Sequence, residues 1–97
     1  MSTVAEPKAA RPKQLYRLPV ILLPELPEDG GGYSVLAVTF PACSQGDTEA
    51  EALANIVEAI LGCWEVYEDR GRPIPWRAEI PEQHEPNAIG RWVELYA

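Results

Sequence analysis

The chain has 97 residues and a net charge of −7, with 46% hydrophobic and 24% charged side chains. This length suits one domain, and this balance excludes a disordered chain. Residues 1–14 hold three basic residues against one acid, a balance of +2, which leaves −9 for the remainder. Such an acidic body repels phosphate backbones, so we expect no direct nucleic-acid binding, and it attracts basic partners. Acidity that only keeps a small protein soluble is the alternative explanation.

The sequence also indicates a compartment. The first fourteen residues lack the apolar core of a signal peptide, and no apolar run approaches the roughly 18 residues of a membrane span. Cys43 and Cys63 do not have the spacing of a metal or redox motif. We therefore expect a cytoplasmic protein with reduced thiols and no membrane contact.

The predicted elements follow the order β-β-β-α-β. Residues 1–14 predict a flexible N-terminal tail and residues 15–97 a single domain. Alternating apolar residues predict strands over 15–23, 33–40, 42–45 and 91–96, with a further extended piece over 76–80. Pro19 cannot donate a ladder hydrogen bond, which favours an edge position for the first strand or a place at its start. The glycine-rich residues 28–32 predict a tight turn.

The helix expected over residues 48–70 is the clearest element. Thr48 and Glu51 fit a capping box at its start. One apolar stripe recurs at three- and four-residue steps and should be buried against the sheet: Leu53, Ile56, Val57, Ile60, Leu61 and Trp64. A helix on an antiparallel meander, with the last strand returning at an edge, makes a two-layer α+β sandwich.

Candidates for catalysis are sparse. The single histidine, His84, lies in a polar loop context, so Ser–His or Cys–His catalysis lacks a convincing base. The first strand carries no acid that could converge with helix carboxylates on a metal ion. We therefore expect no enzyme activity, no metal site and no cofactor. A cryptic metal-dependent hydrolase is the least favoured alternative.

Acidic and aromatic residues are instead candidates for protein binding. Glu51, Glu58 and Glu65 repeat every seven residues, which places them on one exposed flank of the predicted helix. Glu28 and Asp29 add charge in the turn. Large aromatic residues near a chain end often mark association surfaces, which brings in Trp92 and Tyr96. A merely solvated helix face is the alternative for the acids.

A set of residues in the central third of the chain forms a familiar pattern: Gly30, Gly31, Tyr33, Pro41, Cys43, Gly46, Asp47, Thr48, Ala52 and Asn55. An acidic-Gly-Gly-Tyr turn starts the second strand, and a Cys-x-x-Gly-Asp-Thr step leads into Glu-Ala-x-x-Asn on the helix. In this order and spacing, over about residues 16–75, the chain resembles the HicB-like antitoxin family. Ala42 departs from the glycine usual in that family.

The resemblance implies a partly degraded ribonuclease-H-like fold without the catalytic acids. HicB antitoxins bind and block HicA, a small basic ribonuclease, so we expect a non-catalytic, antitoxin-like module that neutralises a HicA-type toxin. We expect it to stand alone, without a C-terminal DNA-binding module. The alternative is an orphan domain of this fold that self-associates without a toxin. A homodimer or larger assembly is expected in both cases, and Cys43 is expected to pack beneath the helix.

Overall fold

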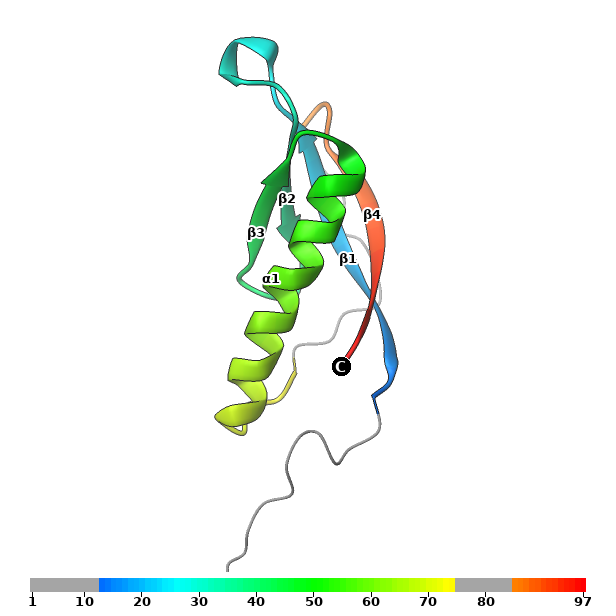
Figure 1. Cartoon of the computed structure of the whole chain (residues 1–97), viewed down its shortest axis with the longest axis vertical. Coiled ribbons are helices and arrows are strands. Elements are labelled where there is room, and N and C mark those ends of the chain that lie inside the picture. The colour runs from blue at the N-terminus through cyan, green and yellow to red at the C-terminus, as the bar shows by residue number, and fades with distance from the viewer. Residues whose placement is uncertain (1–12, 75–84) are drawn as a thin grey trace, which may run out of the picture.

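The computed structural model describes residues 13–74 and 85–97. The predicted tail up to residue 12, the extended piece over 76–80 and His84 lie outside these residues. The described chain forms strands β1 (Leu15–Pro24), β2 (Tyr33–Ala37), β3 (Cys43–Gly46) and β4 (Ile89–Tyr96), the helix α1 (Glu49–Asp69) and a short 3₁₀ turn η2 (Pro27–Asp29). Figure 1 shows α1 lying across one face of the sheet, which gives the two layers of an α+β fold.

Within the described residues the sheet has four strands in the order β3-β2-β1-β4, and every neighbouring pair is antiparallel. The first three strands form the expected meander. The last strand returns beside β1, where Leu18 pairs with Val93 and Leu22 with Ile89. This places β4 at one edge of the sheet, as expected, and β3 at the other.

Pro19 corrects one expectation, because β1 is a central strand that pairs on both sides. Pro19 lies one residue beyond the last residue pair between β1 and β2, which is Val20 with Ala37. There Val38 donates its backbone N–H to the Pro19 carbonyl at 3.2 Å. The missing proline donor therefore weakens only the end of the ladder. A proline is tolerated in this central strand because its neighbour β2 stops at Ala37.

The second strand is also shorter than expected, since it ends at Ala37 instead of residue 40. Ala37 donates its N–H to the carbonyl of Ala42 at 2.9 Å, and this bond closes the reversal into β3. The chain between them is a turn, within which Phe40 still reaches the core. A buried turn residue is as apolar as a buried strand residue. The apolar alternation in the sequence therefore continues to Phe40 and makes the strand look longer than it is.

The core lies between α1 and the sheet. The helix buries residues at four-residue steps, namely Ala52, Ile56, Ile60 and Trp64. They meet sheet residues that share the facing side: Leu18, Val20, Leu22, Val35, Val93 and Leu95. Leu53, Val57 and Leu61 are only half-buried at the border of this stripe, so half of the predicted stripe is fully buried. Ala52 was missed because its methyl group adds little to an apolar pattern.

Candidate protein-binding surfaces

Five residues of the motif meet where β3 leads into α1: Gly46, Asp47, Thr48, Ala52 and Asn55. Thr48 accepts a hydrogen bond from the backbone N–H of Glu51 at 3.1 Å, which satisfies a free amide of the first helical turn. The Glu51 carboxylate in turn accepts from the backbone N–H of Asp47 at 2.7 Å. The expected capping box is confirmed, with the reciprocal bond reaching one residue beyond the cap.

Gly46 and Ala52 allow the strand and the helix to touch through their backbones. A Cβ atom at Gly46 would lie 2.5 Å from the backbone nitrogen of Ala52, which is closer than any side chain tolerates. Asn55 then donates from Nδ2 to the carbonyl of Gln45 at 2.8 Å, one turn further along the helix. These contacts hold the start of α1 on β3. These five residues therefore form a structural junction, in which the Thr48 hydroxyl and the Asn55 amide are both hydrogen-bonded.

The glycine turn has a geometric role as well. Gly30, Gly31 and Gly32 have φ angles of 103°, 70° and 79°, in the left-handed region that favours glycine. A Cβ atom at Gly32 would also lie 2.6 Å from the carbonyl oxygen of Gly46, so this turn packs against the β3–α1 junction. Tyr33 follows as the first, half-buried residue of β2. Pro41 is exposed in the next turn.

The expectation that Cys43 packs beneath the helix is wrong, because this side chain is exposed. Cys43 pairs with Leu36, whereas the preceding pair in β2 is Val35 with Ser44. Val35 is fully buried under α1, so strand alternation sends Leu36 and Cys43 to the opposite face. Ala42 contacts the core instead.

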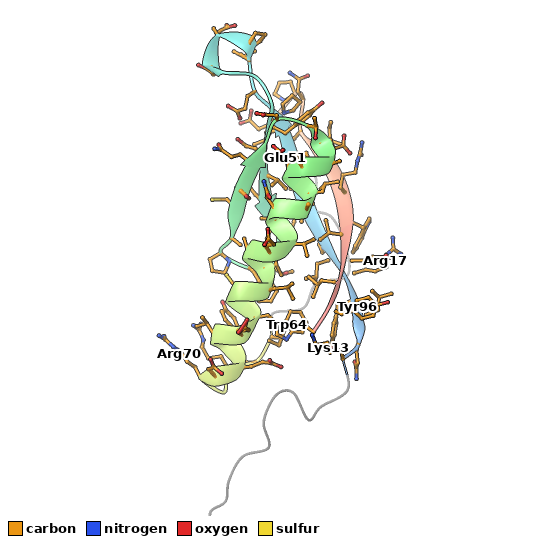
Figure 2. The ribbon with its side chains drawn as sticks, viewed as in Figure 1. Lys13, Arg17, Glu51, Trp64, Arg70 and Tyr96 are labelled. Atoms are coloured by element: carbon orange, nitrogen blue, oxygen red, sulfur yellow. The ribbon has the colours of Figure 1, made fainter. Side chains whose placement is uncertain are left out.

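The acids predicted to share a helix flank do lie together. Glu51, Glu58 and Glu65 are exposed and lie on the side of α1 that is opposite the buried stripe. Figure 2 shows Glu51 near the start of this face and Arg70 beyond its end. We call Glu51, Glu58 and Glu65 the acidic helix face. Among them Glu51 also serves the cap, which leaves Glu58, at the middle of the helix, as the residue with the simplest environment.

Part of the helix charge has an internal use. Glu49 accepts from Nε of Arg91 in β4 at 2.8 Å, which ties the first turn to the sheet. Glu68 and Asp69 lie in the last turn of the helix, at the negative end of the helix dipole. Helix stability favours the opposite charge there. The dipole of the helix therefore does not account for these two acids.

The other candidates lie elsewhere. Glu28 and Asp29 belong to the exposed turn η2, which projects from one end of the molecule (Figure 1). Trp92 and Tyr96 lie on the sheet face opposite α1, with 38% and 62% of their surfaces exposed. The structure thus divides the sequence-predicted binding residues among three places.

Sequence reasoning did not identify the residues that surround Trp92. Arg17 of β1 lies over the Trp92 ring, with 5.6 Å between the guanidinium carbon and the ring centroid. The same guanidinium is 3.9 Å from the Glu94 carboxylate. Leu15 and Leu36 are further exposed apolar residues of this face. The sequence signal for this cluster is strand alternation. It places Trp92 and Glu94 on one face of β4, and Arg17 lies on the same face of the neighbouring β1.

Within residues 13–74 and 85–97 no three His, Cys, Asp or Glu side chains are arranged to hold a metal ion. Over the same residues no helix has the length and apolar character needed to span a membrane.

The chain shares sequence with a known protein. No family model matches the chain. The chain is similar to the UPF0150 protein ssr1765 of Synechocystis sp., with 48% identity over 50 residues. The match covers 50% of this chain and 60% of that protein, so the chain spans less than two thirds of its relative. The name of that protein assigns it no activity.

Proposed function

We propose that this chain is a non-catalytic, antitoxin-like binding module of the HicB-like type, which neutralises a small basic HicA-type ribonuclease through its acidic helix face. The observation that carries the proposal is the solvent side of α1. From Asp47 to Asp69 the chain holds seven acids and no Lys or Arg. Glu58 and Glu65 project from that side, away from the core.

The fold supports this assignment. A β-β-β-α-β order with one helix on an antiparallel sheet is compatible with a partly degraded ribonuclease-H-like fold. The first strand carries no acid, so it lacks the carboxylate that metal-dependent cleavage would require there. Five of the ten residues that carry the resemblance to HicB-like proteins build the β3–α1 junction. That junction fixes the orientation of α1, and with it the orientation of the acidic helix face.

The acidic helix face also suits close approach by a partner. Ala54 and Gly62 are exposed between the acids, and nothing lies within 4 Å of a Cβ atom built at Gly62. A basic side chain can therefore reach the carboxylates without displacing a bulky neighbour. Charges at the rim of an interface chiefly accelerate encounter, and those at its centre slow dissociation. We place Glu58 at the centre of the contact because it lies midway along α1.

The proposal is tested by reversing charge on the acidic helix face. Glu58→Lys, alone or with Glu65→Lys, should slow association with a HicA-type ribonuclease by roughly tenfold or more and flatten its dependence on salt. The domain should stay folded, since Glu58 is exposed on the far side from the core. Stopped-flow association at increasing ionic strength measures the effect, and inhibition of RNA cleavage reports neutralisation.

Glu85→Lys is the matched control. Glu85 is also exposed, lies outside α1 and undergoes the same change of charge. It should leave the association rate close to that of the unmodified protein. If Glu58→Lys and Glu85→Lys slow association equally, net charge alone drives the encounter and the acidic helix face is not the contact surface.

Self-association without a toxin is the second candidate function. The observation that favours it is the face opposite α1, where Trp92, Tyr96, Leu36 and Leu15 are exposed, beside the edge of β4 on which none of the described strands lies. A short open reading frame for a small basic protein beside this gene favours the toxin-binding function. Its absence favours an orphan domain.

A further inference from the structure

In the part of the chain that the structure describes, the outer side of the edge strand β4 pairs with no other strand. Gln14 and Ala97 exchange both of their backbone hydrogen bonds, at 3.1 Å each. In an antiparallel ladder such pairs alternate, so Leu95, Val93 and Arg91 also turn their N–H and C=O groups toward β1. The residues between them turn theirs to the open side: Gly90, Trp92, Glu94 and Tyr96. Among the described strands none lies on that side.

The two edges of the sheet differ in how well they are protected. The edge strand β3 spans only Cys43–Gly46 and is tied to α1 at its end. In contrast, β4 spans eight residues, Ile89–Tyr96, and contains neither a proline nor a lysine. Proteins commonly protect an exposed edge by shortness, proline or lysine. The charged residues of β4 are Arg91 and Glu94. Arg91 is paired with Glu49, and Glu94 lies near Arg17.

We propose that β4 pairs antiparallel with β4 of a second copy of this chain, about a two-fold axis at Val93, to form a continuous sheet across the dimer. This inference rests on the self-association considered above, and it adds the surface and the register. In this register Trp92 lies opposite Glu94 of the second copy, and Gly90 lies opposite Tyr96. Every outward-facing backbone group of β4 is then paired, because each such pair exchanges both N–H···O bonds.

The side chains of the outer face are complementary in this register. Tyr96, which is 62% exposed, lies opposite Gly90 of the second copy, a residue that has no side chain of its own. Trp92 lies beside Glu94 of the second copy. Within one copy Arg17 already lies near both Trp92 and Glu94, so the same three residue types meet on both sides of the two-fold axis. The Gly90 carbonyl accepts from Nη1 of Arg91 at 3.1 Å, and it keeps a second lone pair for the partner strand.

The helix leaves room for the second copy. Figure 1 shows α1 crossing the sheet from the β4 side at its start toward the β3 side at its end. Glu49 in the first turn contacts Arg91 near the start of β4. Val93 and Leu95 face the core from the edge strand, so two copies joined at β4 bring their apolar layers together. In this arrangement the end of α1 lies away from the β4 edge at which the second copy pairs.

The backbone pairing is tested with a proline that affects only the open side. Glu94 points its N–H outward, so Glu94→Pro removes an intermolecular donor and leaves the bonds to β1 in place. Glu94→Gln is the matched control, since it also loses the charge but keeps the N–H. We expect the unmodified protein and Glu94→Gln to sediment at twice the 10.7 kDa chain mass and Glu94→Pro as a folded monomer.

The other outcomes overturn the inference in different ways. A monomeric unmodified protein at micromolar concentration removes self-association itself. A Glu94→Pro variant that remains dimeric keeps self-association and rejects the β4 edge. Equal dissociation of Glu94→Pro and Glu94→Gln shows that charge, and not strand pairing, holds the copies together.

The register is tested by cross-linking, which also serves if Glu94→Pro fails to fold. In a background of Cys43→Ser and Cys63→Ala, Val93→Cys should form a disulfide-linked dimer under mild oxidation. Residues at such a two-fold position lie about 4.5 Å apart between Cα atoms, within reach of a disulfide. Arg91→Cys is the control, because its counterpart lies roughly 13 Å away along the partner strand. Absence of the Val93→Cys link, or an equally efficient Arg91→Cys link, overturns the register.

Discussion

Gly46 and Gly62 are chemically identical residues with opposite surroundings, and this difference makes a matched test. A Cβ atom at Gly46 would meet the backbone of Ala52 at 2.5 Å, and this backbone cannot rotate away as a side chain can. Gly46→Ala should therefore lower the free energy of unfolding by about 1–3 kcal/mol, the usual cost of overpacking. Gly62 lies within α1 with open space around it. Gly62→Ala should raise the free energy of unfolding by about 0.5–1 kcal/mol, because alanine favours the helix.

Urea unfolding of both variants measures the two changes. A stable Gly46→Ala variant would show that β3 and α1 separate readily, and the motif would then need another explanation. The sequence pattern could name Gly46, Asp47 and Thr48 as residues of a helix start. It could not show that Gly46 and Ala52 are in backbone contact, because that contact depends on where the helix crosses the strand. Cys43 was misplaced for the same reason, since its face depends on the register between β2 and β3.

Among the elements, α1 provides the clearest test of burial. Ile60 is fully buried in the middle of the helix, whereas Leu53 lies half-buried at the border of the stripe. Ile60→Ala should lower the free energy of unfolding by about 2–5 kcal/mol, because it leaves a cavity beneath the helix. Leu53→Ala should cost about 1 kcal/mol, since its side chain keeps much of its contact with water in the folded protein. Equal costs would indicate that α1 is rotated about its axis relative to this structure.

The helix and the strands were not equally predictable. The bounds of α1 followed closely from the capping box at Thr48 and from the glycine after Arg70, since both are local signals. The end of β2 did not, because Phe40 is buried within a turn and extends the apolar alternation. Pro19 indicated an edge strand, yet it occupies the centre of the sheet beside the end of β2. Strand position depends on partners that are distant in sequence, and single-sequence patterns do not carry that information.

For the whole molecule, the important result is that the candidate surfaces have different orientations. The acidic helix face points away from the sheet on one side, and Trp92 and Tyr96 lie on the sheet face turned the other way. The sequence supplied both sets of residues, but only the fold shows that they do not form one site. A basic partner on α1 and a second copy at β4 therefore do not compete for the same residues.

This separation predicts that the two proposed interactions are energetically independent. Glu58→Lys should weaken binding of a HicA-type ribonuclease and leave the dimer mass unchanged. Glu94→Pro should produce a monomer that still binds the ribonuclease, with the affinity per chain altered by less than about 0.5 kcal/mol. The double variant should show both changes without a further loss. Titration calorimetry and sedimentation of the four proteins measure the cycle.

A larger coupling would contradict the arrangement proposed here. If Glu94→Pro weakened ribonuclease binding as much as Glu58→Lys does, the partner would have to contact both copies across the β4 junction, or bind the β4 edge itself. The route for such coupling is visible, since Glu49 at the start of α1 is bonded to Arg91 in β4 at 2.8 Å. Arg91→Gln breaks that ion pair and leaves both surfaces in place. It should therefore remove any coupling that passes through the start of the helix, and it should leave unchanged any coupling that arises from a shared contact surface.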